Sequence, residues 1–374
     1  AYASPNGCIL APSVEAKKMG VKTGMRVKDG KLLCRDLIIL GPDPWKYRNV
    51  HLELKKLLLE YSNIVIPKSI DEFVINFEGY PSFNRGLHLT AKEIKNRIKS
   101  EIGDWLTVSV GIGPNRFLAK TASNLKKPDG LEEINFENFA DIYQRLSLPD
   151  LCGIDRNFTA RLNSAGIFSV TDFYNAPLSQ LRIAFRSIVS YYWYLRLRGW
   201  EIDDVETERK SFGHMYSLPK PFSSPQDLSP ILHKLVQKMA HRLRLKGYKT
   251  RGIHLGILYR DHSFWHQAVT LSADLFDSGD IYKIAFKLLL KSPYHQAVAN
   301  LSVSCFNLNR NPSLQLDLFD SVAKKYRLSA AVDDINEKWG DFVMTPAAMV
   351  TAGSYVPDRI SFGGVKDLEQ FITS

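Results

Sequence analysis

The chain has 374 residues, of which 45% are hydrophobic and 24% charged, so it can bury several cores and form two to four units. No run approaches the ~18 apolar residues of a membrane span, and the first residues lack the charged-then-apolar pattern of a signal peptide. These two features predict a soluble, cytoplasmic protein without a membrane partner. Lys and Arg number 49 against 39 Asp and Glu, a net charge of +10 that suits nucleic acid but does not prove it. The four scattered cysteines exclude a C-x-x-C zinc site.

The first third of the chain alternates between helical and strand patterns. Apolar residues recur at helical spacing in some segments, while others are rich in aromatic and β-branched residues. The predicted elements are a helix at 47–61, strands at 64–66 and 73–77, a helix at 90–102, a strand at 106–112 and a helix at 114–124. The predicted strand 64–66 ends at a break containing Pro67 and Ser69. Such alternation predicts an α/β layer.

The character of the chain changes after the turn sequence "PDG" at 128–130. Residues 139–199 show only helical periods separated by glycine and proline, which predicts a small all-helical unit. The acidic stretch "EIDDVETE" at 201–208 is interpreted as a linker.

Residues 212–308 carry a different alternation. The pattern predicts strands at 212–218, 251–259, 264–272 and 298–308, with helices at 226–246 and 279–291. The order β-α-β-β-α-β predicts two helices on an antiparallel sheet. From residue 309 onward the pattern weakens into a tail.

Two adjacent acids, Asp71 and Glu72, stand at the mouth of a predicted strand in "KSIDEFVINF", residues 68–77. A solvated polar turn is the ordinary explanation of such a pair. The chemical alternative is a pair of carboxylates that hold two divalent ions for in-line phosphoryl transfer. That alternative requires a third acid from another strand.

Four segments decide between these readings by resemblance. "SIDEFVINF" at 69–77 resembles the S-I-D-E turn of the Y-family, translesion DNA polymerases, and "VSVGIGPNRFLAKTASNLKKPDGL" at 108–131 resembles the next block of that family. "VEAKKMGVKTGM" at 14–25 is similar to its finger segment, and "LCGIDRNFTARLNSAGI" at 151–167 to its thumb helix-hairpin-helix. The resemblance covers most of the chain.

This resemblance implies an α+β multidomain fold: a right-hand polymerase with palm, fingers and helical thumb, followed by a β-α-β-β-α-β little-finger domain. The implied boundaries are fingers 1–43, palm 44–138, thumb 139–200, linker 201–211, little finger 212–308 and tail 309–374. The family places its first metal-binding aspartate, and the aromatic residue that rejects ribonucleotides, upstream of the finger segment. The sequence is therefore interpreted as an N-terminally incomplete polymerase, with partial fingers and palm and impaired activity.

The resemblance also assigns catalytic roles. Asp71 would be a ligand of both Mg²⁺ ions, and Glu72 would support the ion that activates the primer 3′ hydroxyl. Lys127 matches the lysine that reaches the incoming triphosphate. Lys17 stands where the family has arginine and offers a point charge instead of a fork, while Val14 replaces a tyrosine and loses its hydroxyl.

DNA contacts are implied in the thumb and the little finger. The backbone N–H groups of Gly153 and Ile154 would hold a DNA phosphate, although Asp155 stands where the family usually has glycine. A basic cluster near the end of the first little-finger helix, alternatively a solvated face, is predicted to contact phosphates. Its members are Arg242, Arg244, Lys246, Lys249 and Arg251, and the predicted DNA-binding residues among them are Arg242, Arg244, Lys249 and Arg251. Arg116, Lys120 and Lys126 are candidates for adding to the basic face, and no individual role is assigned to any of them.

The tail sequence "QLDLF" resembles the bacterial sliding-clamp-binding peptide. Its residues are Gln315, Leu316, Asp317, Leu318 and Phe319. The implied partners are primer-template DNA, deoxynucleoside triphosphates and a sliding clamp, with the chain itself a monomer. The expected function is low-fidelity DNA synthesis past damaged bases, and the alternative is a non-catalytic DNA- and clamp-binding adaptor in damage tolerance.

Overall fold

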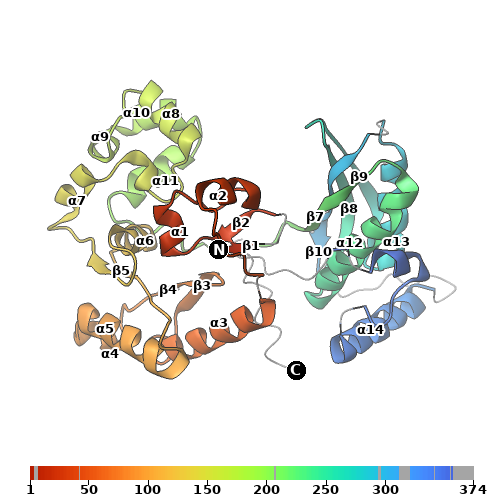
Figure 1. Ribbon diagram of the computed structural model, residues 1–374, viewed down its shortest axis with the longest axis horizontal. Coiled ribbons are helices and arrows are strands. Elements are labelled where there is room, and N and C mark those ends of the chain that lie inside the picture. Colours follow the sequence, from red (N-terminus) through yellow and green to blue (C-terminus); the bar gives the residue numbers. More distant parts are fainter. Residues whose placement is uncertain are drawn as a thin grey trace. The chain divides into compact units, whose positions relative to one another are not determined.

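The structure is a computed structural model in which the described residues form two compact units, one within Ala1–Val205 and the other within Glu206–Asp358 (Figure 1). It describes residues 1–3, 7–41, 43–205, 208–293, 296–310, 321–340, 342–353 and 355–356. Among these residues no helix is both long and apolar enough to cross a bilayer.

The N-terminal segment folds around a small core of its own. Two short antiparallel strands and two helices enclose buried residues that include Ile9 and Val27. These elements are β1 (Tyr2–Ala3), β2 (Ile9–Ala11), α1 (Val14–Lys18) and α2 (Val27–Leu33). Ser13 caps α1 by accepting a hydrogen bond from the backbone N–H of Ala16 at 3.2 Å, which starts the helix at the segment that carries Lys17.

Residues 43–133 form two two-stranded sheets with helices against them. The elements are α3 (Pro44–Leu59), β3 (Val65–Ser69), β4 (Glu72–Ile75), α4 (Pro81–Asn84), α5 (Leu87–Arg97), η1 (Ile98–Ile102), β5 (Val110–Ile112), α6 (Arg116–Leu125) and β6 (Leu131–Glu133). The sequence expectation of a break at Pro67 is wrong, because β3 continues through it. A strand with a partner on one side only tolerates the missing N–H of proline.

The stretch that follows is all-helical, as the sequence predicts. Its helices are α7 (Phe139–Arg145), η2 (Leu148–Asp150), α8 (Arg156–Ser164), α9 (Val170–Asn175), α10 (Leu178–Phe185) and α11 (Val189–Arg196). A core rich in aromatic side chains holds them together, with Phe173 and Trp193 buried at its centre and Phe117 of α6 packed edge-on against Trp193. This core therefore joins the helical stretch to α6.

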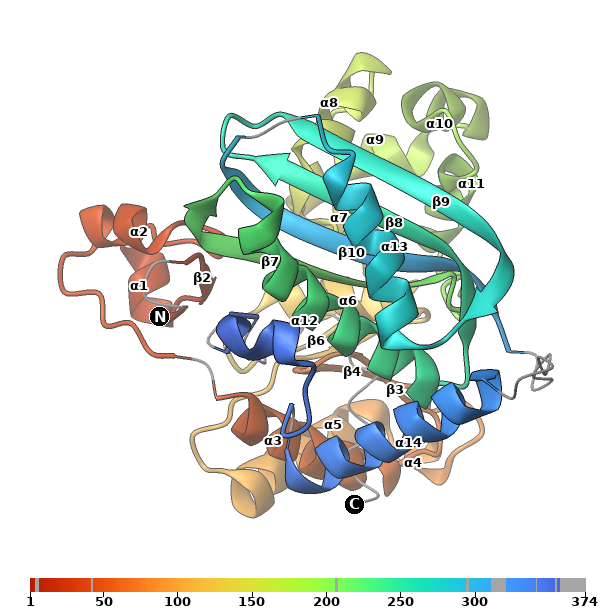
Figure 2. The same cartoon turned by 90° about the vertical axis from the view of Figure 1, so that its right-hand side faces the viewer.

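The second unit contains a four-stranded antiparallel sheet in the order β7-β10-β8-β9. Two helices, α12 and α13, lie side by side on one face of it (Figure 2). The elements are β7 (Ser211–Phe222), α12 (Pro225–Leu245), β8 (Lys249–Tyr259), β9 (Phe264–Leu275), α13 (Ser278–Leu290) and β10 (Val298–Asn309). The predicted β-α-β-β-α-β order is confirmed.

The segment after β10 contains more structure than the sequence pattern predicts. It includes α14 (Ser321–Trp339) and η3 (Ala347–Ala352), both packed in the second unit. Lys234 of α12 is only 7% exposed, and its ammonium donates to the carbonyl oxygens of Gly353 at 3.0 Å and Tyr355 at 2.6 Å. The prediction of a patternless tail is therefore wrong for the described part of 321–356.

Candidate functional site

The two adjacent acids lie on a tight hairpin. β3 and β4 pair with Ser69 opposite Glu72, so Ile70 and Asp71 form the two-residue connection between the strands. Ile70 points into the protein and is 2% exposed, whereas Asp71 is exposed. The hydroxyl of Ser69 donates to Asp71 Oδ1 at 2.5 Å. The hairpin thus presents the Asp71 carboxylate to solvent and orients it from one side.

Glu72 is held from a different element. Lys120 of α6 donates to Glu72 Oε2 at 2.6 Å, and the two side chains are 29% and 35% exposed. Such a partly exposed ion pair contributes modest stability but restricts the direction of the carboxylate. Sequence reasoning missed this contact, which joins residues 48 positions apart.

Lys127 completes a cluster of charges around the hairpin. Burial lowers the pKa of Lys127, and the positive charges of Lys120 and Lys17 lower it further, while Glu72 and Asp71 act in the opposite direction. These interactions require each of the other four side chains to lie within electrostatic reach of Lys127. The structure therefore brings together the four predicted metal and triphosphate residues, and adds Lys120 to them.

The carboxylates fit a hard divalent cation. Mg²⁺ prefers oxygen ligands and is commonly bound by one or two carboxylates together with substrate phosphates and water. Asp71 offers exposed oxygens, and the Lys120 ammonium on Glu72 shows that a cation is accommodated beside it. Within the described ranges no group of three or more His, Cys, Asp or Glu residues is arranged to hold a metal.

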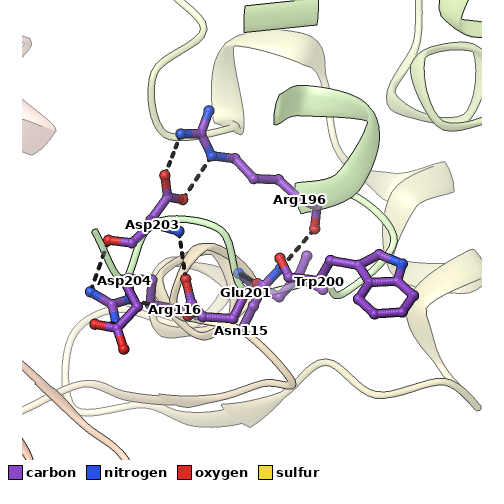
Figure 3. Close-up of polar contacts among 8 residues, drawn as sticks. Asn115, Arg116, Arg196, Trp200, Glu201, Asp203 and Asp204 are labelled. Carbon is purple, nitrogen blue, oxygen red and sulfur yellow. Dashed lines mark hydrogen bonds and ion pairs between the residues drawn. The ribbon is translucent and has the colours of Figure 1, made fainter. Parts of the chain in front are cut away.

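The acidic stretch at 201–204 is bound to the start of α6 (Figure 3). Glu201 accepts from the backbone N–H of Arg116 at 2.9 Å and pairs with its guanidinium at 3.1 Å, and Asp204 pairs with the same guanidinium at 2.6 Å. Arg116 is 11% exposed. Two carboxylates therefore neutralise Arg116, which adds little net positive charge to this face.

A second set of contacts holds the same stretch from α11 (Figure 3). Asp203 accepts from Arg196 Nε at 2.7 Å, and the side-chain amide of Asn115 donates to the carbonyl oxygens of Arg196 and Trp200, both at 2.9 Å. We call Glu201, Asp203 and Asp204 the linker anchor. Its contacts show that the linker is fixed over its first four residues.

The predicted thumb hairpin has the geometry of a tight turn. Gly153 has a φ of 96°, a conformation that favours glycine. Asp155, where the family usually has glycine, has a φ of −88° and caps α8 by accepting from the N–H of Phe158 at 2.8 Å. Aspartate is therefore compatible with the turn. Ile154 is buried, and its backbone N–H donates to the carbonyl oxygen of Leu151 at 3.0 Å. In this conformation that N–H is therefore not available to a DNA phosphate.

The predicted little-finger cluster is largely engaged within its own unit. Arg242 donates to the carbonyl of Gly213 at 2.6 Å, and Arg251 pairs with Asp274 at 2.6 Å while remaining half exposed. Arg244 makes two bonds to one carboxylate and is 11% exposed. Lys249 lies at the start of β8.

The predicted clamp-binding peptide lies outside the described residues. It consists of Gln315, Leu316, Asp317, Leu318 and Phe319.

Comparison with known proteins matches both parts of the chain. A family model described as "impB/mucB/samB family" matches residues 1–124, and one described as "impB/mucB/samB family C-terminal domain" matches residues 209–318. "DNA polymerase IV" of Pelotomaculum thermopropionicum is 31% identical over 360 residues, 95% of this chain and 89% of that protein. "DNA polymerase IV 1" of Bacillus subtilis is 30% identical over 342 residues, covering 89% and 82%.

A solved structure shares the fold. The "Y-family DNA polymerase chimera Dbh-Dpo4(243-245)-Dbh" superposes with a TM-score of 0.70 at 23% identity, covering 82% of this chain and 90% of its own. This likeness supports the same fold for the chain.

Proposed function

The chain belongs to the Y-family of DNA polymerases, in its DNA polymerase IV-like group, and we propose that its β3–β4 hairpin holds two Mg²⁺ ions for template-directed extension of a DNA primer. The observation that supports this proposal is the cluster of charged side chains around the β3–β4 hairpin. Lys127 lies within electrostatic reach of Asp71, Glu72, Lys17 and Lys120, and Lys120 pairs with Glu72 directly. The two carboxylates would hold cations there, and the ammonium groups of Lys17 and Lys127 would hold polyphosphate.

Each side chain has a distinct task in this proposal. Bound Mg²⁺ would supply Lewis-acid stabilisation and activate the primer 3′ hydroxyl. Asp71 presents exposed oxygens to both ions, and Glu72, held by Lys120, supports the ion at the primer end. Lys127 and Lys17 contact the triphosphate as point charges. Burial lowers the pKa of Lys127, and a bound polyanion would raise that pKa again, because it stabilises the protonated amine.

DNA would be bound at two places. The backbone N–H of Gly153 holds one backbone phosphate at the thumb hairpin, a contact that reads no base. The N–H of Ile154 is already bonded to the Leu151 carbonyl and acts in the turn itself. Arg242, Lys249 and Arg251 contact phosphates from the second unit. We expect Arg244, included in the predicted cluster, to act in folding, because its guanidinium is already bound to a carboxylate.

We further propose low-fidelity synthesis past damaged bases, with the peptide at 315–319 tethering the polymerase to a sliding clamp. In the clamp-binding peptide that this segment resembles, glutamine bonds at the rim of an apolar pocket, and the leucine and phenylalanine fill it. Tethering raises the local concentration of the polymerase at the primer end.

The test is primer extension by the full-length gene product carrying Asp71→Asn, which keeps the size of the side chain but removes its charge. Extension should fall by more than about a hundredfold, because several kcal/mol of charge stabilisation disappear. The dissociation constant for primed DNA should not change. Asp104→Asn, an exposed acid of the same unit, is the matched control and should extend normally.

Two results would contradict the proposal. Undiminished Mg²⁺-dependent extension by Asp71→Asn would remove the metal site from this hairpin. A natural protein that binds primed DNA and clamp but never extends, at any Mg²⁺ concentration, would favour the non-catalytic adaptor.

A further inference from the structure

A buried histidine contacts the chain on both sides of Asp71. His51 of α3 is 1% exposed, and its Nδ1 lies 2.8 Å from the carbonyl oxygen of Ile70. Its ring stacks on Phe73, with the centroids 4.7 Å apart and the planes inclined by 26°. His51 therefore touches the residue before Asp71 and the residue two positions after it.

The hydrogen bond determines the tautomer of His51. A carbonyl oxygen only accepts, so Nδ1 carries the proton and donates it to Ile70. The other ring nitrogen, Nε2, is buried and has no hydrogen-bond partner among the described residues. Buried polar atoms without partners are uncommon, so the retention of an imidazole here points to a specific use of Nδ1.

The hairpin needs support from outside its own sequence. Two-residue hairpin connections favour turns with a positive φ at one or both central positions, because these match the twist of the strands. Neither Ile70 nor Asp71 has a positive φ, and the register of β3 and β4 shifts between Pro67 and Ser69. Local preference therefore does not specify this turn, and a contact from α3 supplies what it lacks.

We propose that His51 is a positioning residue that anchors the Ile70 carbonyl and thereby fixes the Asp71 carboxylate for metal binding. The inference rests on the function proposed above, since it deepens the role of Asp71. Tyr47, one helical turn before His51, is close enough to Asp71 to interact with it electrostatically. One face of α3 thus lies along the whole connection.

Two variants of the full-length protein separate the hydrogen bond from the packing. His51→Phe keeps an aromatic ring against Phe73 but cannot donate to Ile70. His51→Asn loses the ring but offers an amide N–H near the position of Nδ1. His233→Phe is the matched control, because His233 is also buried and stacked, on Tyr282 at 4.0 Å, yet neither of its ring nitrogens has a hydrogen-bond partner within the described ranges.

His51→Phe should lower kcat by about 10- to 100-fold, the effect expected when a reacting group is misplaced by about 1 Å. KM for the nucleotide and the affinity for primed DNA should stay unchanged. Mn²⁺ should bind more weakly to the complex with primed DNA and a non-hydrolysable nucleotide. His51→Asn should recover most of kcat, and His233→Phe should retain all of it.

The outcomes separate this inference from the proposed function. If Asp71→Asn is inactive while His51→Phe keeps normal kcat and Mn²⁺ affinity, the positioning role alone is overturned. If Asp71→Asn extends normally, the proposed function fails and this inference fails with it. Should His51→Phe not fold, His51→Leu, which also cannot donate to Ile70, takes its place: a low kcat in His51→Leu that His51→Asn restores supports the role, and a normal kcat in His51→Leu overturns it.

Discussion

Replacing Asp333 by Asn should loosen helix α14 from the second unit. The Asp333 carboxylate accepts from Arg244 Nε at 2.6 Å and from Nη2 at 2.7 Å, and His241 Nδ1 lies 3.1 Å away. The same guanidinium donates to the Phe276 carbonyl and the Ser278 hydroxyl. The side chains of Arg244 and Asp333 are 11% and 18% exposed. The variant would thus leave a nearly buried cation without its counter-charge.

The expected loss of folding stability follows from the pKa of Asp333. Burial alone would raise this pKa, but hydrogen bonds from Arg244 and His241 outweigh burial and lower it from 3.8 to about 2. A difference of this size corresponds to roughly 2 kcal/mol of folding stability. Because the folded pKa is depressed, the contribution is complete above about pH 4 and disappears as the pH falls towards 2. Asp333→Asn should cost at least this amount at pH 7, since an unpaired buried charge adds its own penalty.

The assay is urea denaturation combined with hydrogen exchange of the α14 amides, on the full-length protein at pH 7, 4 and 3. Asp334→Asn is the control, because its carboxylate is the exposed neighbour of Asp333 on the same helix. At pH 7 only Asp333→Asn should lose stability and amide protection, and the gap to wild type should narrow at pH 3. Equal stability of both variants at pH 7, or a gap that does not narrow in acid, would refute the reasoning.

The other predictions concern function. Lys120→Met should reduce primer extension and raise the Mg²⁺ concentration needed for it, whereas Lys120→Arg should retain most of the activity. The measurement is primer extension as a function of Mg²⁺ concentration, and an unchanged curve for Lys120→Met would show that the Lys120–Glu72 ion pair has no role in catalysis. Affinity for primed DNA should fall steeply as salt rises, since phosphate contacts dominate it, and a fluorescence-anisotropy curve that is flat in salt would speak against such contacts. Joint replacement of Leu318 and Phe319 by Ala should abolish retention on immobilised sliding clamp while clamp-free extension continues, and undiminished retention would assign clamp binding elsewhere.

Much of the fold was predictable because its elements carry regular local patterns. The strands of the second unit alternate between core and surface, and Ile253, Leu255 and Ile257 on β8 are all buried. Helix α14 was missed because little of it is buried. Its docking depends on ion pairs such as Asp333 with Arg244 and Lys325 with Asp280, which join residues 89 and 45 positions apart. The spacing of apolar residues along the chain does not indicate ion pairs between residues so far apart in the sequence.

In the candidate site, too, the sequence revealed some residues, while the contacts that orient them became visible only in the structure. Asp71 and Glu72 were found because their order and neighbours resemble a family motif. The contacts that orient them come from α3 and α6: His51 bonds to Ile70 from 19 positions away, and Lys120 reaches Glu72 from 48. Both depend on how helices pack against a hairpin, which depends on tertiary structure and not on spacing along the chain.

The linker anchor also ties two helices that are far apart in the sequence. Asp203 is bound to Arg196 of α11, whereas Glu201 and Asp204 are bound to Arg116 at the start of α6. Asn115 adds two hydrogen bonds from the same end of α6 to the carbonyl oxygens of Arg196 and Trp200. Because α6 also carries Lys120, which pairs with Glu72, the stretch after α11 and the acidic hairpin are held by the same helix. Loss of the Arg116 side chain would therefore free Asp204 from α6 while Asp203 stayed on α11.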